Sequence, residues 1–224
     1  MRSSGIGIVL AVCAFACTSG AAWAGRGKAL GAVSQANNST VDNQTALAGA
    51  DVYACDVLDT DNFGDLRVQF HGSQIVLGTS TETVLDGSPD SVHVIIINGS
   101  TSFASPSSAA LVIDTPAGEL REVSGGAYTG TVTITGPNEE VVSAVRGTIT
   151  LHAGGVLNSI PAGKAARITF DHPAQSGCRE PGYIHKPVGA GKIGFKLIAV
   201  GVAAAGGYFT WQELTESETK PDEF

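Results

Sequence analysis

The chain has 224 residues, of which 43% are hydrophobic and 15% are charged, and its formal net charge is −8. This composition is too apolar and too weakly charged for a disordered protein, and the 29 glycines follow no three-residue period, which excludes a collagen helix. The acidic balance argues against a nucleic-acid partner, because no basic face is available to contact phosphates. The length suits a single domain.

Residues 1–24 are predicted to be an export signal. Arg2 is the one charge among them, residues 5–17 form an apolar run, and Ala22-Trp23-Ala24 has the small-x-small form of a cleavage site. Thirteen apolar residues span ~20 Å as a helix, which is short of the ~30 Å hydrocarbon core of a membrane. We therefore expect cleavage between Ala24 and Gly25.

Residues 25–50 are rich in Gly, Ala, Asn and Ser without periodicity, and they are expected to be a flexible lead-in. From residue 51 to about 175 the chain predicts short strands, because apolar and polar residues alternate between turn signals every 8–12 residues. Asn98-Gly99 favours a tight hairpin turn between two of these strands. The expected strands comprise residues 66–70, 74–77, 92–97, 101–103, 111–113, 119–123, 130–135, 141–151, 156–160 and 166–170.

The predicted fold class is therefore all-β. The region between residues 25 and 192 has only seven aromatic residues, so its core is expected to consist of Val, Ile, Leu and Ala. Such a core suits thin, closely stacked sheets, and either a β-solenoid or an elongated β-sandwich is consistent with the pattern.

Residues 176–192 are expected to be a Gly/Pro linker, followed by a transmembrane helix over residues 193–211 and an acidic tail over residues 212–224. The 19 residues of this apolar segment would span ~28 Å as a helix, and its single charge, Lys196, lies near one end. The flanking charges oppose the positive-inside rule. The alternative is an apolar helix that packs on the β domain or on a partner.

The search for chemical motifs assigns no catalytic, cofactor-binding or metal-ligating residue. Residues 189–194 spell G-x-G-x-x-G but follow no strand, which favours a hinge over a dinucleotide site. Residues 59–64 begin like a calcium loop, but Phe63 and Phe70 occupy ligand positions, so a solvated turn is expected. The adjacent pair Glu139 and Glu140 would face opposite sides of a strand, which is unsuitable for a paired acid and base.

Residues 52–60 and 66–77 resemble the opening of the FecR-type periplasmic domain, in which a Gly-Asp turn, a strand, a Gly-Ser turn and a second strand follow one another. Cys55 stands where that family's pattern has glycine before the aspartate. Residues 92–103 and Thr115-Pro116-Ala117 resemble the family's next two elements. The resemblance covers residues 50–155 and implies an all-β domain outside the cytoplasmic membrane of a bacterium.

These observations predict an exported, membrane-anchored, non-enzymatic β domain that serves as a binding or structural module of the bacterial envelope. Its expected partners are an unidentified protein or envelope component, and the membrane through the C-terminal helix. One alternative is a periplasmic sensor that relays a signal through a membrane partner. A second alternative is an envelope hydrolase without a recognisable motif.

Cys55 and Cys178 are predicted to form a disulfide, because they are the two cysteines left after signal cleavage in a chain sent to an oxidising compartment. The alternative is two unrelated thiols. Closing so long a loop would stabilise the fold by roughly 4–5 kcal/mol. Cys55→Ser should therefore lower the melting temperature of the oxidised protein and leave that of the reduced protein unchanged. Two free thiols in protein kept from reductant, measured by mass spectrometry, would contradict the pairing.

Overall fold

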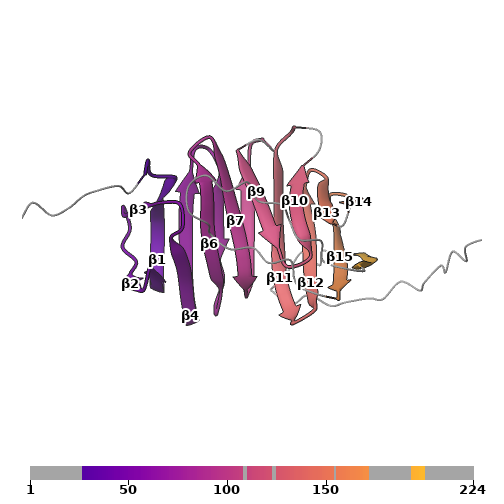
Figure 1. Ribbon diagram of the computed structural model, residues 1–224, viewed down its shortest axis with the longest axis horizontal. Coiled ribbons are helices and arrows are strands. Elements are labelled where there is room, and N and C mark those ends of the chain that lie inside the picture. The colour runs from indigo at the N-terminus through magenta and orange to yellow at the C-terminus, as the bar shows by residue number, and fades with distance from the viewer. Residues whose placement is uncertain (1–26, 108–109, 123–124, 154, 172–192, 200–224) are drawn as a thin grey trace, which may run out of the picture.

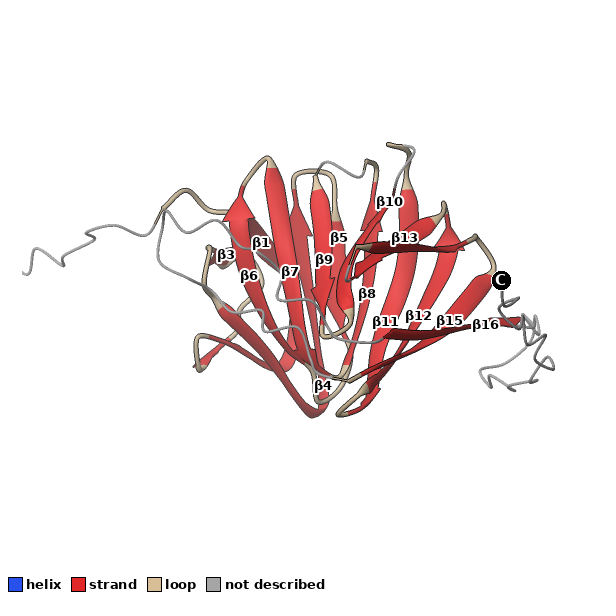
Figure 2. Ribbon diagram, turned by 45° about the vertical axis from the view of Figure 1, so that its right-hand side comes forward, coloured by secondary structure: helices blue, strands red, loops and turns tan. Residues whose placement is uncertain are grey.

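The computed structural model describes residues 27–107, 110–122, 125–153, 155–171 and 193–199, and these residues form strands and turns without a helix (Figure 2). The predicted all-β class is confirmed. The strands are β1 (Gly31–Val41), β2 (Gln44–Thr45), β3 (Asp51–Val52), β4 (Val57–Phe70), β5 (Gln74–Leu77), β6 (Glu82–Ser88), β7 (Ser91–Asn98), β8 (Ser100–Ser105), β9 (Leu111–Thr115), β10 (Gly118–Glu122), β11 (Tyr128–Gly136), β12 (Glu139–Arg146), β13 (Ile149–Ala153), β14 (Val156–Ile160), β15 (Lys164–Phe170) and β16 (Ile193–Ala199).

All described strands belong to one sheet that folds over on itself into a nearly closed, barrel-like shape. The main path runs in the order β14-β13-β10-β9-β7-β6-β4-β5-β8-β11-β12-β15-β16. We call β6, β7, β9, β10, β13 and β14 half A, and β5, β8, β11, β12, β15 and β16 half B. The strands succeed one another along the long axis of the molecule, from β1 and β4 at one end to β13–β16 at the other (Figure 1).

The long strand β4 joins the two halves. Its first residues pair with β6 of half A, and its last residues pair with β5 of half B. β1 pairs antiparallel with β4 along both parts, with register shifts between Val33 and Gln35 and between Asn37 and Ser39. The flexible lead-in predicted for residues 25–50 is therefore wrong for β1 and β2, and the two bulges explain why β1 lacks the alternation of a regular strand.

The solvated turn predicted at residues 59–64 is also wrong, because these residues lie inside β4. Thr60 is buried there, and its hydroxyl donates to the carbonyl oxygen of Gly78 over 2.6 Å. A Cβ at Gly64 would overlap the carbonyl oxygen of Asn38 on β1. Residues 59–64 thus remain in the strand although they lack the apolar alternation, because hydrogen bonds and the close approach of β1 hold them there.

The chain alternates between the halves, one or two strands at a time. Consecutive strands within a half form the hairpins β9–β10 and β11–β12, and the end of β4 forms a hairpin with β5. The hairpin predicted at Asn98-Gly99 is wrong, because β7 pairs with β6 and β9, whereas β8 pairs with β5 and β11. Gly99 has a φ of 87°, and Thr81 accepts from the backbone N–H of Ser100 over 2.9 Å, so the chain can turn into the other half.

The single strand expected over residues 141–151 is also interrupted. The chain turns at Gly147, where φ is 74°.

The core lies between the two halves and consists mainly of Val, Ile, Leu and Ala side chains, as predicted. Two aromatic residues, Phe103 and Tyr128, pack at its centre with ring centroids 5.7 Å apart. Tyr128 on half B donates its hydroxyl to the carbonyl oxygen of Leu111 on half A over 2.6 Å. Burial of this phenol raises its pKa well above the usual 10. The two halves are therefore joined by hydrogen bonds as well as by apolar packing.

For Ile193–Ala199 the predicted transmembrane helix is wrong, because these residues form strand β16 at the edge of half B. Ile193 and Phe195 pack against the core, whereas the alternating residues Gly194 and Lys196 are exposed, and this period of two is that of a strand. No helix among the described residues is long and apolar enough to span a membrane. Residues 200–224, the expected linker at residues 176–192 and the signal at residues 1–24 lie outside the described residues.

Gly130 on β11 tests the close approach of the two halves. A Cβ there would lie 2.5 Å from Cδ1 of Ile149 on half A and 2.9 Å from Cζ of Phe103. Gly130→Ala should lower the free energy of unfolding by about 1–3 kcal/mol, because Ile149 of the facing half must move and because the methyl group would also lie 2.5 Å from the Ser143 carbonyl oxygen on the neighbouring β12. Gly136→Ala on the same strand is the control, since its nearest neighbour would be 4.0 Å away. Equal urea midpoints for the two variants would contradict this packing.

Candidate functional site

The residues singled out by the sequence lie in different parts of the chain. Ala24, Gly25 and Cys178 lie outside the described residues, so the cleavage site and the Cys55–Cys178 disulfide stay predictions. Cys55 lies between β3 and β4, is exposed, and donates its backbone N–H to Leu85 of β6 over 2.8 Å. Its φ is 72°, a conformation in which glycine is ordinary and other residues are uncommon.

Glu139 and Glu140 face opposite sides of β12, as predicted. Glu139 is on the outer surface of half B, whereas Glu140 points into the core and is fully buried. The pair is thus separated by the sheet, and its members have different environments.

Glu140 connects the two halves through the turn between β9 and β10. Its Oε1 accepts from the Thr115 hydroxyl over 2.8 Å, and its Oε2 accepts from the Ala117 backbone N–H over 3.4 Å. Burial raises the pKa of Glu140 from 4.5 to about 7, and the two hydrogen bonds oppose this rise only in part. This role could not be predicted from the sequence, because a glutamate in a polar turn is normally solvated.

A second polar contact lies on the outer face of half A. His93 of β7 and Asp114 of β9 meet with Nδ1 and Oδ2 2.9 Å apart, and Arg121 pairs with Glu119 on the adjacent β10. The hydrogen bond with Asp114 raises the pKa of His93 above 6.5, although burial opposes the rise. The parallel register of β7 and β9 places these side chains together, and this pairing could not be read from the sequence.

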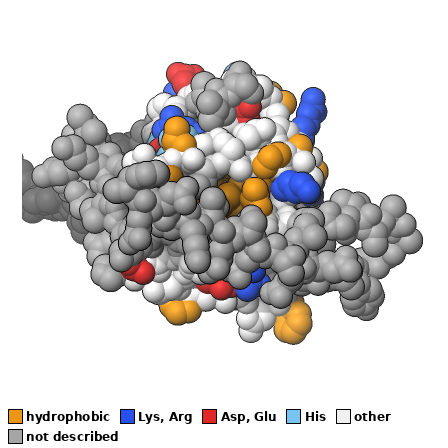
Figure 3. Space-filling model, turned by 90° about the vertical axis from the view of Figure 1, so that its right-hand side faces the viewer, with side chains coloured by type: hydrophobic (Ala, Val, Ile, Leu, Met, Phe, Trp, Pro, Cys, Tyr) orange, Lys and Arg blue, Asp and Glu red, His pale blue; other side chains and the backbone are white. Residues whose placement is uncertain are grey.

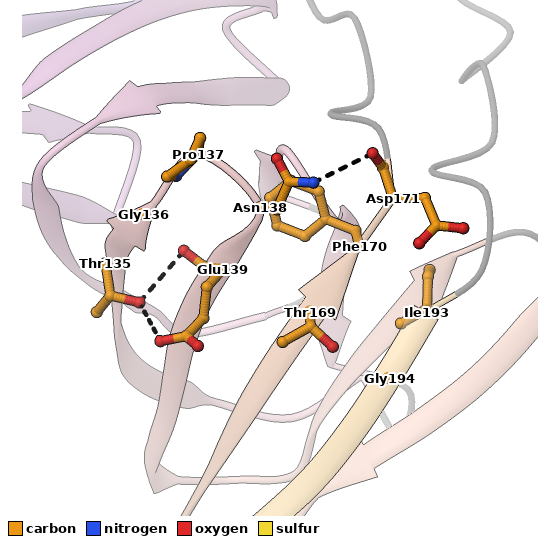
Figure 4. A pocket seen from close by; sticks show the side chains of 10 residues that line it. All are labelled: Thr135, Gly136, Pro137, Asn138, Glu139, Thr169, Phe170, Asp171, Ile193 and Gly194. Atoms are coloured by element: carbon orange, nitrogen blue, oxygen red, sulfur yellow. Dashed lines mark hydrogen bonds between the residues drawn. The ribbon is translucent and has the colours of Figure 1, made fainter.

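The pocket of about 680 Å³ in Figure 4 lies where the β11–β12 turn meets β15 and the start of β16. Its wall includes the hydroxyls of Thr135 and Thr169 and the carboxylates of Glu139 and Asp171. Thr135 donates to Glu139 over 2.8 Å, and Asn138 donates to the Asp171 carbonyl oxygen over 3.2 Å. These bonds fix the turn on the end of β15, so the polar groups of the wall primarily hold the local structure.

The described residues contain no group of three or more His, Cys, Asp or Glu side chains placed to hold a metal ion. In the same ranges, His93 has Asp114 as its partner, Glu140 has Thr115 and Ala117, and Glu139 has Thr135. These contacts join strands to strands or turns to strands. The arrangement therefore supports a structural role for each of these groups.

The end of the fold that contains β14 and β16 exposes large apolar side chains. β14 and β16 are the two ends of the sheet path, and in the described ranges β14 pairs with β13 alone. Val156 and Leu157 on β14 are 57% and 63% exposed. Figure 3 views this end and shows hydrophobic side chains at the surface beside Lys and Arg. The sequence predicted β14 as a strand but could not show that it lies at an edge.

No family model matches the chain, and the comparison with curated proteins finds no match.

The buried Glu140 should make stability depend on pH. Its raised pKa means that the folded protein binds more protons than the unfolded chain between pH 4.5 and about 7, so the free energy of unfolding falls as pH rises through this window. A shift of this size corresponds to about 3 kcal/mol. Glu140→Gln should remove this loss, which makes the variant's urea-unfolding profile flatter from pH 5 to pH 8. Glu139→Gln should retain the wild-type profile, and equal profiles for both variants would contradict the assignment.

Proposed function

We propose that the protein is an exported, non-enzymatic binding module of the bacterial envelope that takes up an extended strand of a protein partner along β14. The observation that carries this proposal is the character of the β14 edge. Residues Val156–Ile160 contain no charged residue and no proline. Soluble proteins normally protect such an edge with charges, prolines or bulges, because its free N–H and C=O groups can pair with another chain.

The opposite edge strand offers a comparison within the same molecule. β16 exposes Lys196, and a charge of this kind discourages pairing of an edge with a foreign strand. β14 lacks such protection and exposes two large apolar side chains. An added strand would gain main-chain hydrogen bonds to β14 and apolar contacts with Val156 on one side and Leu157 on the other.

Export and the envelope location are supported by the sequence of residues 1–24 and by the FecR-type resemblance. The positive φ of Cys55 agrees with that resemblance, because this position is glycine in the family's pattern. A signal-relay protein would also need a docking surface of this kind, and the partner's identity would decide between the two roles.

The test places a photo-crosslinking amino acid at position 157 of the full chain in cells that export it. One discrete crosslinked protein should appear, and its crosslinked peptide should be a segment able to extend as a strand. Leu157→Lys should weaken binding of that purified partner by about tenfold or more, because the charge would have to be buried or displaced. Leu47→Lys is the matched control, since Leu47 is 67% exposed near the other end of the fold. The crosslinking amino acid is also placed at position 47 as a control. Equal crosslinking from positions 47 and 157, or none from either position, would overturn the proposal.

A further inference from the structure

The two halves of the sheet do not finish at the same point along the long axis. β14 is the last strand of half A, and it lies against β12 and β15 of half B. Half B continues by one more strand, β16, whose substantial contacts among the described strands are with β15 alone. Figure 1 shows β16, coloured yellow-orange, beyond β14 and β15. In the part of the chain that the structure describes, half A therefore has no strand opposite β16.

Apolar side chains that point to the inner side of the sheet are exposed on both of these edge strands. Leu197 of β16 pairs with the core residue Ala166, so it faces inward, yet it is 47% exposed. Val156 of β14 pairs with the core residue Ala153 and is 57% exposed on the same inner side. Inward-facing apolar residues are normally covered by the facing half of such a fold. We call the uncovered space beside the edge of β14 and over the inner face of β16 the slot.

The shape of the slot suits a single extended strand. In the described ranges β14 pairs with β13 alone, so its other edge offers main-chain N–H and C=O groups to an extended chain. A strand bonded there would lie about 4.8 Å from β14 and would extend half A in the direction in which half B already continues. Its inward side chains would contact Leu197 and lie beside Val156, whereas its outward side chains would lie beside Leu157. One added strand would thus bring the two halves to the same length.

The charges beside the slot are basic, although the chain as a whole has a net charge of −8. Lys164 of β15 pairs with the core residue Ala144, so it shares the inner face with Leu197, and it is exposed. Arg146 follows Ala144 by two residues on β12 and is also exposed. The ion pairs found among the described residues include neither of these cations. A carboxylate on the incoming strand would therefore find an opposite charge at this side of the slot.

We propose that the partner strand bound along β14 is amphipathic, with apolar side chains at alternate positions in the slot against Leu197 and an acidic side chain beside Lys164. This inference rests on the proposed function, because it names the class of strand that β14 takes up. It adds a second surface, on half B, to the binding site. Main-chain bonds to β14 accept any extended segment, whereas the slot selects segments in which apolar residues alternate.

The first test compares the two faces of the captured strand. A photo-crosslinking amino acid is placed at position 156, 157 or 197 of the full chain, one at a time, in cells that export it. All three positions should capture the same segment of the same protein. Residues crosslinked from positions 156 and 197 should be separated by an even number of positions along that segment, and those crosslinked from position 157 should alternate with them. Position 145 is the matched control, since Val145 is 66% exposed but alternates with the core residues of β12 and faces outward.

The outcomes separate this inference from the proposed function. Capture from position 157 without capture of the same segment from position 197 would overturn the slot and leave strand uptake along β14 standing. Equal capture from positions 145 and 197 would have the same meaning. No capture from position 157, or capture of nothing except a second copy of this chain, would overturn both.

The second test concerns the charge beside the slot and uses the captured protein in purified form. Lys164→Glu should weaken its binding by about three- to tenfold and make binding less sensitive to added salt, because an attraction is replaced by a repulsion. Lys28→Glu is the matched control, since Lys28 is exposed and precedes β1 at the other end of the fold. Equal affinities of the two folded variants would overturn the acidic contact.

Discussion

The pairing of β1 with the whole length of β4 is the interaction on which the remaining structure depends. β4 has fourteen residues, begins in half A and ends in half B, and β1 follows it through both parts. β4 connects the halves because it pairs with β6 of half A and with β5 of half B, and β1 holds these two parts of β4 together along their other side. The bulges in β1 and the close contact at Gly64 allow the pair to bend while its hydrogen bonds continue. The sheet is thereby continuous at one end and has its free edges at the other.

The core that results is thin, and polar groups cross it. Tyr128 reaches Leu111 and Glu140 reaches the β9–β10 turn, so each bond joins half A to half B. A hydrogen bond of this kind adds about 1 kcal/mol, but loss of one partner leaves a buried polar group at a larger cost. These contacts therefore specify how the halves align more than they raise the total stability. The carboxyl of Glu140 makes this alignment sensitive to protonation.

Strands with an unbroken alternation could be predicted from the sequence, as residues 66–70 and 130–135 show. β1 could not, because its bulges shift the apolar positions and Asn38 adopts a positive φ. β16 was mistaken for a helix because Ile193 and Phe195 lie in an apolar run that continues beyond the strand. Asn98-Gly99 indicated a turn correctly, but a dipeptide does not determine which strands are joined. The roles of Glu140 and the β14 edge depend on pairings between distant strands, and a single sequence holds no information of that kind.

The alternation of the chain between the halves has a consequence for the way the protein folds. β7 and β9 are parallel neighbours in half A, and β8, which lies between them in the sequence, belongs to half B. Neither half is a continuous stretch of chain, so neither can be completed before the other has also been started. Most native contacts join residues far apart in sequence, which is typical of slow folding. During synthesis, the apolar strands must remain unpaired until their partner strands have been made. β14, at the free edge, is exposed to other chains throughout that time.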